Sequence, residues 1–229
     1  MSIKYADIVP WGRSFEEYCD MFLLSTSDLD RRILSVGDGP ASFNVRMRRK
    51  EQIVTSVDPS YSLSAEEFRN RIAEVYNTVI NQTRQNSDKF VWTRIKNIDE
   101  LGKMRMSAMN EFCSDFEHGK TEGRYIPASL PVLPFKSKSF DLILTAHLLF
   151  FYSDNYDLDF HLTSLRELIR LGNEVRIFPL VDLNSERSPY LDDVLADLTS
   201  MHIHFSIEKV KYHFQKTGNE MLRILNSDE

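Results

Sequence analysis

The sequence contains little cysteine and no excess of positive charge. Cys19 and Cys113 are the two cysteines among 229 residues, so at most one disulfide bond can form, and neither has the spacing of a metal ligand. We therefore expect a reducing, cytoplasmic setting. The net charge of −6 argues against a general nucleic-acid-binding protein, which needs a basic surface to neutralise phosphates.

Long hydrophobic runs and internal repeats are also missing. The longest apolar stretch, residues 140–152, is interrupted by Asp141, Thr145 and His147 and is shorter than the ~20 residues of a membrane-spanning helix. The N-terminus has no apolar signal-peptide core. His202 and His204 share a strand face with no third ligand in view. We expect no membrane partner and no metal site.

Short apolar runs alternate with amphipathic segments along the chain. Five runs are predicted to be strands: residues 31–36, 52–57, 125–126, 140–146 and 174–181. Capping boxes at Ser14 and Ser64 predict helix starts, and the helical spacing of residues 157–171 ends at Gly172. This alternation predicts a parallel sheet with helices on both faces.

The C-terminal part has a different pattern. Apolar residues alternate at 203, 205 and 207 and then, in opposite parity, at 210, 212 and 214. A β-bulge near Glu208 would join these two runs, because one extra residue reverses the face of a strand. Residues 221–225 form a last strand after a turn. The pattern predicts an antiparallel strand at the end of the parallel sheet.

A glycine turn joins the first predicted strand to a helix. Glycine at positions 37 and 39 permits a tight turn and the close approach of a ligand to the backbone. Asp58 ends the next strand, nineteen positions after Gly39, where a carboxylate can accept hydrogen bonds from both ribose hydroxyls of an adenosine. The turn and the acid together favour an adenosine-containing cofactor. The alternative is a tight turn beside a solvated aspartate.

Two residues of this turn disfavour a dinucleotide. Ser42 stands where the dinucleotide fingerprint has its third glycine, which allows close packing of the pyrophosphate. Pro40 removes a backbone N–H at the start of the helix, where a phosphate would bind.

Three segments, residues 36–43, 57–59 and 133–144, together resemble the motifs of the class I S-adenosylmethionine-dependent methyltransferases, and the resemblance covers residues 30–229. It implies a Rossmann-like three-layer α/β/α sandwich with a mostly parallel seven-stranded sheet and an antiparallel C-terminal strand. It also implies that the turn residues Gly37, Asp38, Gly39 and Pro40 lie at the methionine part of the cofactor.

The resemblance implies further cofactor contacts. Asp58 would hold the ribose and Pro59 would lie along the adenine. Ser129 and Leu130 match the place where the family often has an acidic residue that contacts the adenine amine, followed by a backbone contact. The family usually has an acid where this chain has Ser35, and often an aspartate at the position of Ser129. Both departures weaken the expected polar contacts to the cofactor.

Three more residues are candidates. By the resemblance, Ala146 and His147 would face the reactive sulfonium. His147 could remove a proton from the acceptor, or it could only shape the pocket wall. Arg13 could pair with the cofactor carboxylate, or it could be a surface arginine on an aromatic helix.

We therefore expect a single methyltransferase-like domain over residues 1–229, with an N-terminal helical cap at 1–30 and a helical insertion at 62–124 that could form a lid. The expected function is methyl transfer from S-adenosylmethionine to a small molecule. A non-catalytic cofactor-binding member of the fold is the alternative, and an NAD-dependent oxidoreductase is a second one.

Overall fold

The computed structural model describes residue 3 and residues 9–226. Seven strands form one sheet in the order β3-β2-β1-β4-β5-β7-β6. Their bounds are β1 Ile33–Val36, β2 Val54–Val57, β3 Tyr125–Ile126, β4 Phe140–Ala146, β5 Gly172–Phe178, β6 His204–Lys209 and β7 Glu220–Leu225. Strands β1 to β5 pair in parallel, whereas β7 is antiparallel to both β5 and β6. The predicted mostly parallel sheet with a reversed C-terminal strand is confirmed.

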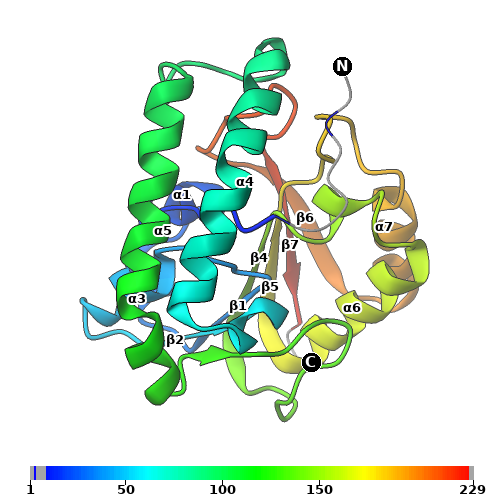
Figure 1. Cartoon of the computed structure of the whole chain (residues 1–229). Helices are drawn as coiled ribbons and strands as arrows, with labels where there is room; N and C mark the ends of the chain where they lie inside the picture. Colours follow the sequence, from blue (N-terminus) through cyan, green and yellow to red (C-terminus); the bar gives the residue numbers. More distant parts are fainter. Residues whose placement is uncertain (1–2, 4–8, 227–229) are drawn as a thin grey trace.

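Helices cover both faces of this sheet, as Figure 1 shows. Their bounds are α1 Phe15–Met21, α2 Thr26–Leu29, α3 Phe43–Arg48, α4 Ala65–Gln85, α5 Ile98–Thr121, α6 Leu158–Leu171 and α7 Leu191–Ser200. Successive strand side chains point to opposite faces. In β4, Leu142 and Leu144 therefore pack with α1 and α3, whereas Ile143 packs with α6 and α7. Both faces of the central strands are buried, as in other parallel sheets.

The predicted helix ends agree with the structure. The hydroxyls of Ser14 and Ser64 accept hydrogen bonds from the backbone N–H groups three residues on, and the glutamates there return a bond to each cap. The N–H of Gly172 donates to the carbonyl of Leu168 and ends α6.

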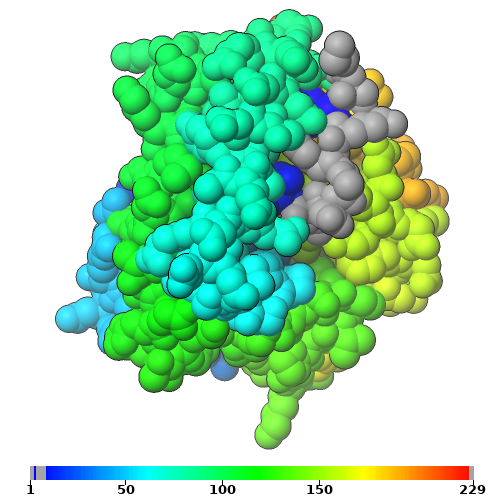
Figure 2. All heavy atoms as spheres, viewed as in Figure 1, coloured from blue at the N-terminus to red at the C-terminus, as the bar shows by residue number. Residues whose placement is uncertain are grey.

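Residues 62–124 contain the two longest helices, α4 and α5, which lie side by side in Figure 1. Their contact is aromatic: Phe68 meets Phe112 and Phe116 edge to face, with ring centroids 5.1 Å apart in both pairs. Figure 2 shows these helices as one continuous face of the molecule, beside the described part of the N-terminal segment. No helix in the described part of the chain is long and apolar enough to cross a membrane.

The predicted bulge near Glu208 is wrong. Strand β6 ends at Lys209, and residues 210–214 form no strand. Their alternation has another cause, because Tyr212 reaches a buried polar cluster while Phe214 stacks on Phe90 with centroids 4.7 Å apart. Val210 and Tyr212 therefore pack against side chains of β4, β5 and β7, although their own segment is not a strand.

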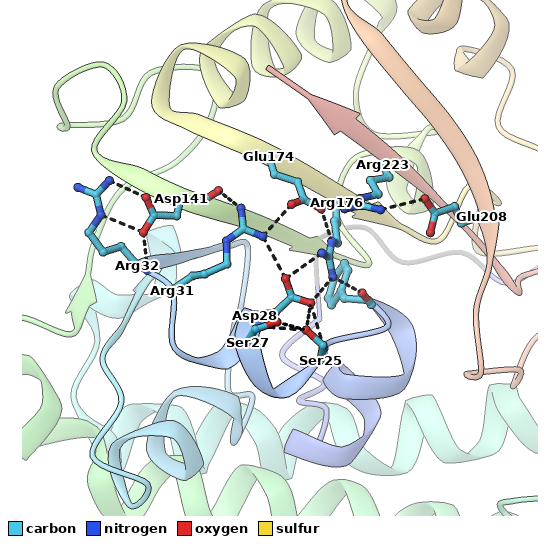
Figure 3. A network of polar contacts seen from close by, with 11 residues as sticks. Ser25, Ser27, Asp28, Arg31, Arg32, Asp141, Glu174, Arg176, Glu208 and Arg223 are labelled. Carbon is cyan, nitrogen blue, oxygen red and sulfur yellow. Dashed lines mark hydrogen bonds and ion pairs between the residues drawn. The ribbon is translucent and has the colours of Figure 1, made fainter. Parts of the chain in front are cut away.

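An ion-pair network ties the amino ends of the parallel strands together (Figure 3). Glu174 accepts hydrogen bonds from Arg31, Arg176 and Arg223, each at 2.7 Å. Arg176 also binds Asp28, which lies in α2 before β1. Because β1 and β5 are parallel, these residues lie at one edge of the sheet, opposite the carboxyl ends of the strands.

Candidate functional site

A cavity of about 720 Å³ lies at the carboxyl ends of β1, β2 and β4. This is the edge at which open α/β sheets bind ligands. The residues that the sequence suggested for a site all line it: Arg13, Gly37, Asp38, Gly39, Pro40, Asp58, Pro59, Ser129, Leu130, Ala146 and His147. They come from five separate segments of the chain, which only the fold brings together.

The turn after β1 requires its two glycines for different reasons. Both have left-handed backbones, with φ of +68° at Gly37 and +51° at Gly39. A Cβ on Gly37 would lie 2.5 Å from Cδ2 of Leu148, so that side of the turn is closely packed. A Cβ on Gly39 would have Oδ2 of Asp58 as its nearest neighbour, 3.9 Å away. The backbone at Gly39 is thus open to a ligand.

Asp58 joins the end of β2 to this turn. Its Oδ2 accepts the N–H of Gly39 at 3.0 Å, and its Oδ1 accepts the N–H of Ser60 at 2.9 Å and the Ser60 hydroxyl. Burial raises the pKa of Asp58, and the bonds from Ser60 and Gly39 partly oppose that rise. An ionised carboxylate has about four acceptor positions, so Oδ2 keeps a free one for a ligand hydroxyl.

Asp38 supplies the carboxylate that the sequence lacks at position 35. Its side chain accepts hydrogen bonds from the hydroxyls of Ser35 and Ser56, each at 2.6 Å, and from Tyr18. Burial raises the pKa of Asp38, and these three hydroxyls lower it in part. Asp38 lies three residues after Ser35, and the turn between them brings its carboxylate next to the Ser35 hydroxyl. The departure at Ser35 removes no negative charge from the site.

The segment before α1 holds Arg13 against the same turn. Gly12 passes so close to the carbonyl of Pro40 that a side chain there would collide with it, and Ser42 donates its N–H to the carbonyl of Arg13 at 3.0 Å. Arg13 thus lies in the cavity wall, before the helix begins. Its guanidinium donates to the carbonyl of Trp11, while its buried Nε has no partner among the described residues.

A buried polar cluster that the sequence did not reveal lies next to Arg13. Arg105 of α5 donates to Glu17 of α1 at 2.5 Å, and the Tyr212 hydroxyl donates to Glu17 at 3.0 Å. Arg105 and Glu17 are both almost fully buried. Burial alone would raise the pKa of Glu17, but Arg105 and Arg13 outweigh it and lower the pKa to about 2. No local motif marks these residues, because they lie far apart in the sequence.

His147 follows β4 with a left-handed backbone, φ +52°. Its N–H donates to the carbonyl of Phe178 at 2.7 Å, and its ring lies between the rings of Phe151 and Phe178, with centroids 5.0 and 5.4 Å away. Burial, and then the charges of Arg13 and Arg105, lower the pKa of His147 well below its usual value. The imidazole is therefore neutral at physiological pH.

The other candidates lie at or after the ends of β2, β3 and β4. Pro59 follows β2 and begins a 3-10 helix, Pro59–Ser62. Ser129 and Leu130 lie in the loop after β3, where Ser129 forms an isolated bridge with Val132. Ala146 is the last residue of β4. Among residues 3 and 9–226, no three side chains of His, Cys, Asp or Glu come together as a metal site.

Comparison with known proteins gives one relative by sequence and several by structure. No protein-family model matches the sequence. An uncharacterized protein of Methanocaldococcus jannaschii is 33% identical over 223 residues, which are 97% of this chain and 98% of the relative.

Two solved structures of magnesium protoporphyrin IX methyltransferase from Synechocystis PCC 6803 are similar in fold. The one with bound S-adenosylhomocysteine has a TM-score of 0.52 at 10% identity and covers 92% of this chain and 81% of its own. The one with bound S-adenosylmethionine has a TM-score of 0.50 at 10% identity, with coverages of 93% and 78%. The chain belongs to the same family as the Methanocaldococcus jannaschii protein, and its fold is that of the class I S-adenosylmethionine-dependent methyltransferases.

Proposed function

We propose that this protein binds S-adenosylmethionine in the cavity and transfers its methyl group to a small molecule. The observation that carries the proposal is the arrangement of Gly39 and Asp58. An open backbone turn and a half-buried carboxylate face the same space at the carboxyl ends of two adjacent parallel strands. The similar solved structures, one with each form of this cofactor, support the same choice.

The lining residues suit the parts of this cofactor. In the proposal Asp58 accepts the ribose hydroxyls, and Pro59, Ser129 and Leu130 enclose the adenine. Gly37, Asp38, Gly39 and Pro40 lie along the methionine part, and Arg13 pairs with its carboxylate. The unpartnered Nε of Arg13 supports that last role, since a buried donor without an acceptor is costly.

Bound S-adenosylmethionine supplies a methyl group that is activated by its sulfonium. The protein must then orient the acceptor and exclude water. Aligning the nucleophile with the methyl group lowers the activation barrier by up to about 7–11 kcal/mol in model reactions. Ala146 and His147 form the wall at the end of β4. The low basicity of His147 favours a positioning role over proton removal. A cavity of about 720 Å³ suits a small acceptor better than a macromolecule.

Calorimetric titration and thermal unfolding with S-adenosylmethionine, S-adenosylhomocysteine and NAD test the proposal. At a hundredfold excess over the dissociation constant, a bound ligand raises the free energy of unfolding by about 2.7 kcal/mol. This corresponds to a rise in Tm of roughly 5–10 °C for a domain of this size. We expect this shift with the two adenosyl sulfur compounds alone. A shift with NAD alone contradicts the proposal. Binding without methyl transfer to any acceptor identifies a non-catalytic member of the fold.

A further inference from the structure

The cavity has two parts of different chemistry. The carboxylates that line it, Asp38 and Asp58, both belong to the glycine-turn side. The part that adjoins His147, called the distal part here, has apolar and aromatic walls that pack in one cluster: Ile3, Phe90, Phe151, Tyr152, Leu183 and Phe214. None of the residues that the resemblance assigned to the cofactor belongs to this cluster.

Positive charge dominates where the two parts meet. Arg13 and Arg105 both line the cavity and both act on His147. The carboxylate of Glu17 interacts electrostatically with both guanidiniums, and it accepts a hydrogen bond from Arg105. The Nε atoms of both arginines are buried without a partner among the described residues. Because buried charges need compensation, this region favours an anionic ligand and opposes a cationic one.

The distal part also lacks a strong base among its described residues. Burial lowers the pKa of His147, and burial raises the pKa values of Tyr156 and Tyr212. At neutral pH none of these three groups readily takes a proton from an alcohol, a phenol or an ammonium group. A nucleophile that is ionised in water before it binds needs no such base, and carboxylates are ionised at neutral pH, with pKa values near ~4.

We infer that the methyl acceptor is a small molecule with an apolar or aromatic body and a carboxylate, and that the carboxylate oxygen is methylated beside Arg105. This inference rests on the proposed function. A lone pair of the carboxylate oxygen forms the new O–CH₃ bond. The S–CH₃ bond breaks, and its electron pair stays on sulfur. The products are a neutral methyl ester and S-adenosylhomocysteine, and no proton moves.

Three probes with similar bodies and different charges test this inference: phenylacetate, phenylacetamide and phenethylamine. Their binding to the protein saturated with S-adenosylhomocysteine is measured by ligand-observed NMR. We expect phenylacetate to bind at least about tenfold more tightly than the amide, the strength of one charge-assisted hydrogen bond, and the amine to bind least. Equal binding of the three, tighter binding of the amine, or no binding of phenylacetate overturns the inference.

Two charge variants show whether Arg105 causes the preference. The Glu17→Gln, Arg105→Met double variant removes this cation together with its buried partner, so we expect it to weaken phenylacetate binding and leave the amide unchanged. Glu17→Gln removes the shared carboxylate and should strengthen phenylacetate binding. The Tm of each variant shows that it is folded. An unchanged ratio of phenylacetate to amide in both variants contradicts the inference. If S-adenosylhomocysteine does not bind the unmodified protein, the proposed function itself fails, and that is measured separately.

Discussion

The backbone N–H of Gly39 donates a hydrogen bond to Oδ2 of Asp58, with 3.0 Å between nitrogen and oxygen. The bond joins the ends of the adjacent parallel strands β1 and β2 in the wall of the cavity. It orients the carboxylate beside the open backbone of Gly39. Ser60 binds the other carboxylate oxygen, so the carboxylate is held from two sides before any ligand arrives. Pre-organisation of this kind reduces the cost of ordering the site on binding.

Asp58→Asn should weaken the binding of S-adenosylhomocysteine about 10–100-fold. The amide keeps the shape of the side chain but removes a charged acceptor, and hydrogen bonds to charged groups are worth about 1.5–3 kcal/mol. Titration calorimetry measures the change. Ser60→Ala is the matched control, because it removes one bond to Asp58 and keeps the carboxylate. A loss in the control as large as in Asp58→Asn would count against a direct contact.

Gly37→Ala should mainly reduce the stability of the fold, whereas Gly39→Ala should mainly reduce the affinity for S-adenosylhomocysteine. Both alanines must adopt a left-handed backbone, at a cost of about 1–2 kcal/mol. Gly37→Ala also collides with Leu148, which adds about 1–3 kcal/mol of overpacking. Gly39→Ala has room for its methyl group, but the methyl projects into the proposed ligand space. We expect the larger loss of stability in the first variant, by urea unfolding, and the larger loss of S-adenosylhomocysteine affinity in the second. The reverse order would contradict the assignment.

Arg105→Met should destabilise the protein by about 3–5 kcal/mol, because it leaves Glu17 buried without its main partner. The double variant Glu17→Gln with Arg105→Met should recover much of this loss. Urea unfolding of the two single variants and the double variant measures the coupling. Arg46→Met is the control. The ion pair of Arg46 with Glu111 is exposed, so we expect the free energy of unfolding to fall by less than about 1 kcal/mol. Additive losses in the cycle would mean that the pair is not coupled.

Acid should weaken the fold through Glu17. The folded pKa of about 2 lies below the ordinary value of 4.5, so the carboxylate contributes stability that is present above pH 4.5 and is lost as the pH falls toward 2. The full contribution is about 3 kcal/mol. Burial raises the pKa values of Asp38 and Asp58, which acts in the opposite direction.

The effect of Glu17 is isolated by comparing urea midpoints of the unmodified protein and the Glu17→Gln, Arg105→Met double variant at a series of pH values. We expect a shallower acid loss in the double variant, in which this carboxyl group is absent. Parallel curves would show that Glu17 does not set the acid sensitivity.

Much of the sheet could be predicted from local pattern. Apolar runs at residues 140–146 and 174–181 predict two central strands, of which the second is observed at Gly172–Phe178. Helix caps such as Ser64 depend on hydrogen bonds within three residues. The segment 210–214 shows the limit of this reasoning. Its alternation is real, but Tyr212 and Phe214 are buried by packing against other elements and not by belonging to a strand. Periodicity records burial and does not identify what buries a side chain.

The sequence by itself determined the glycine turn, the acid at the end of the second strand and the alternation that makes the sheet parallel, because each depends on neighbouring residues. Only the tertiary structure decided how Asp38 supplies the missing carboxylate beside Ser35, since that depends on the directions of three hydroxyls. It also decided that Arg105, Glu17 and Tyr212 meet next to Arg13. These residues lie far apart along the chain, and their charges interact strongly only because folding removes them from water.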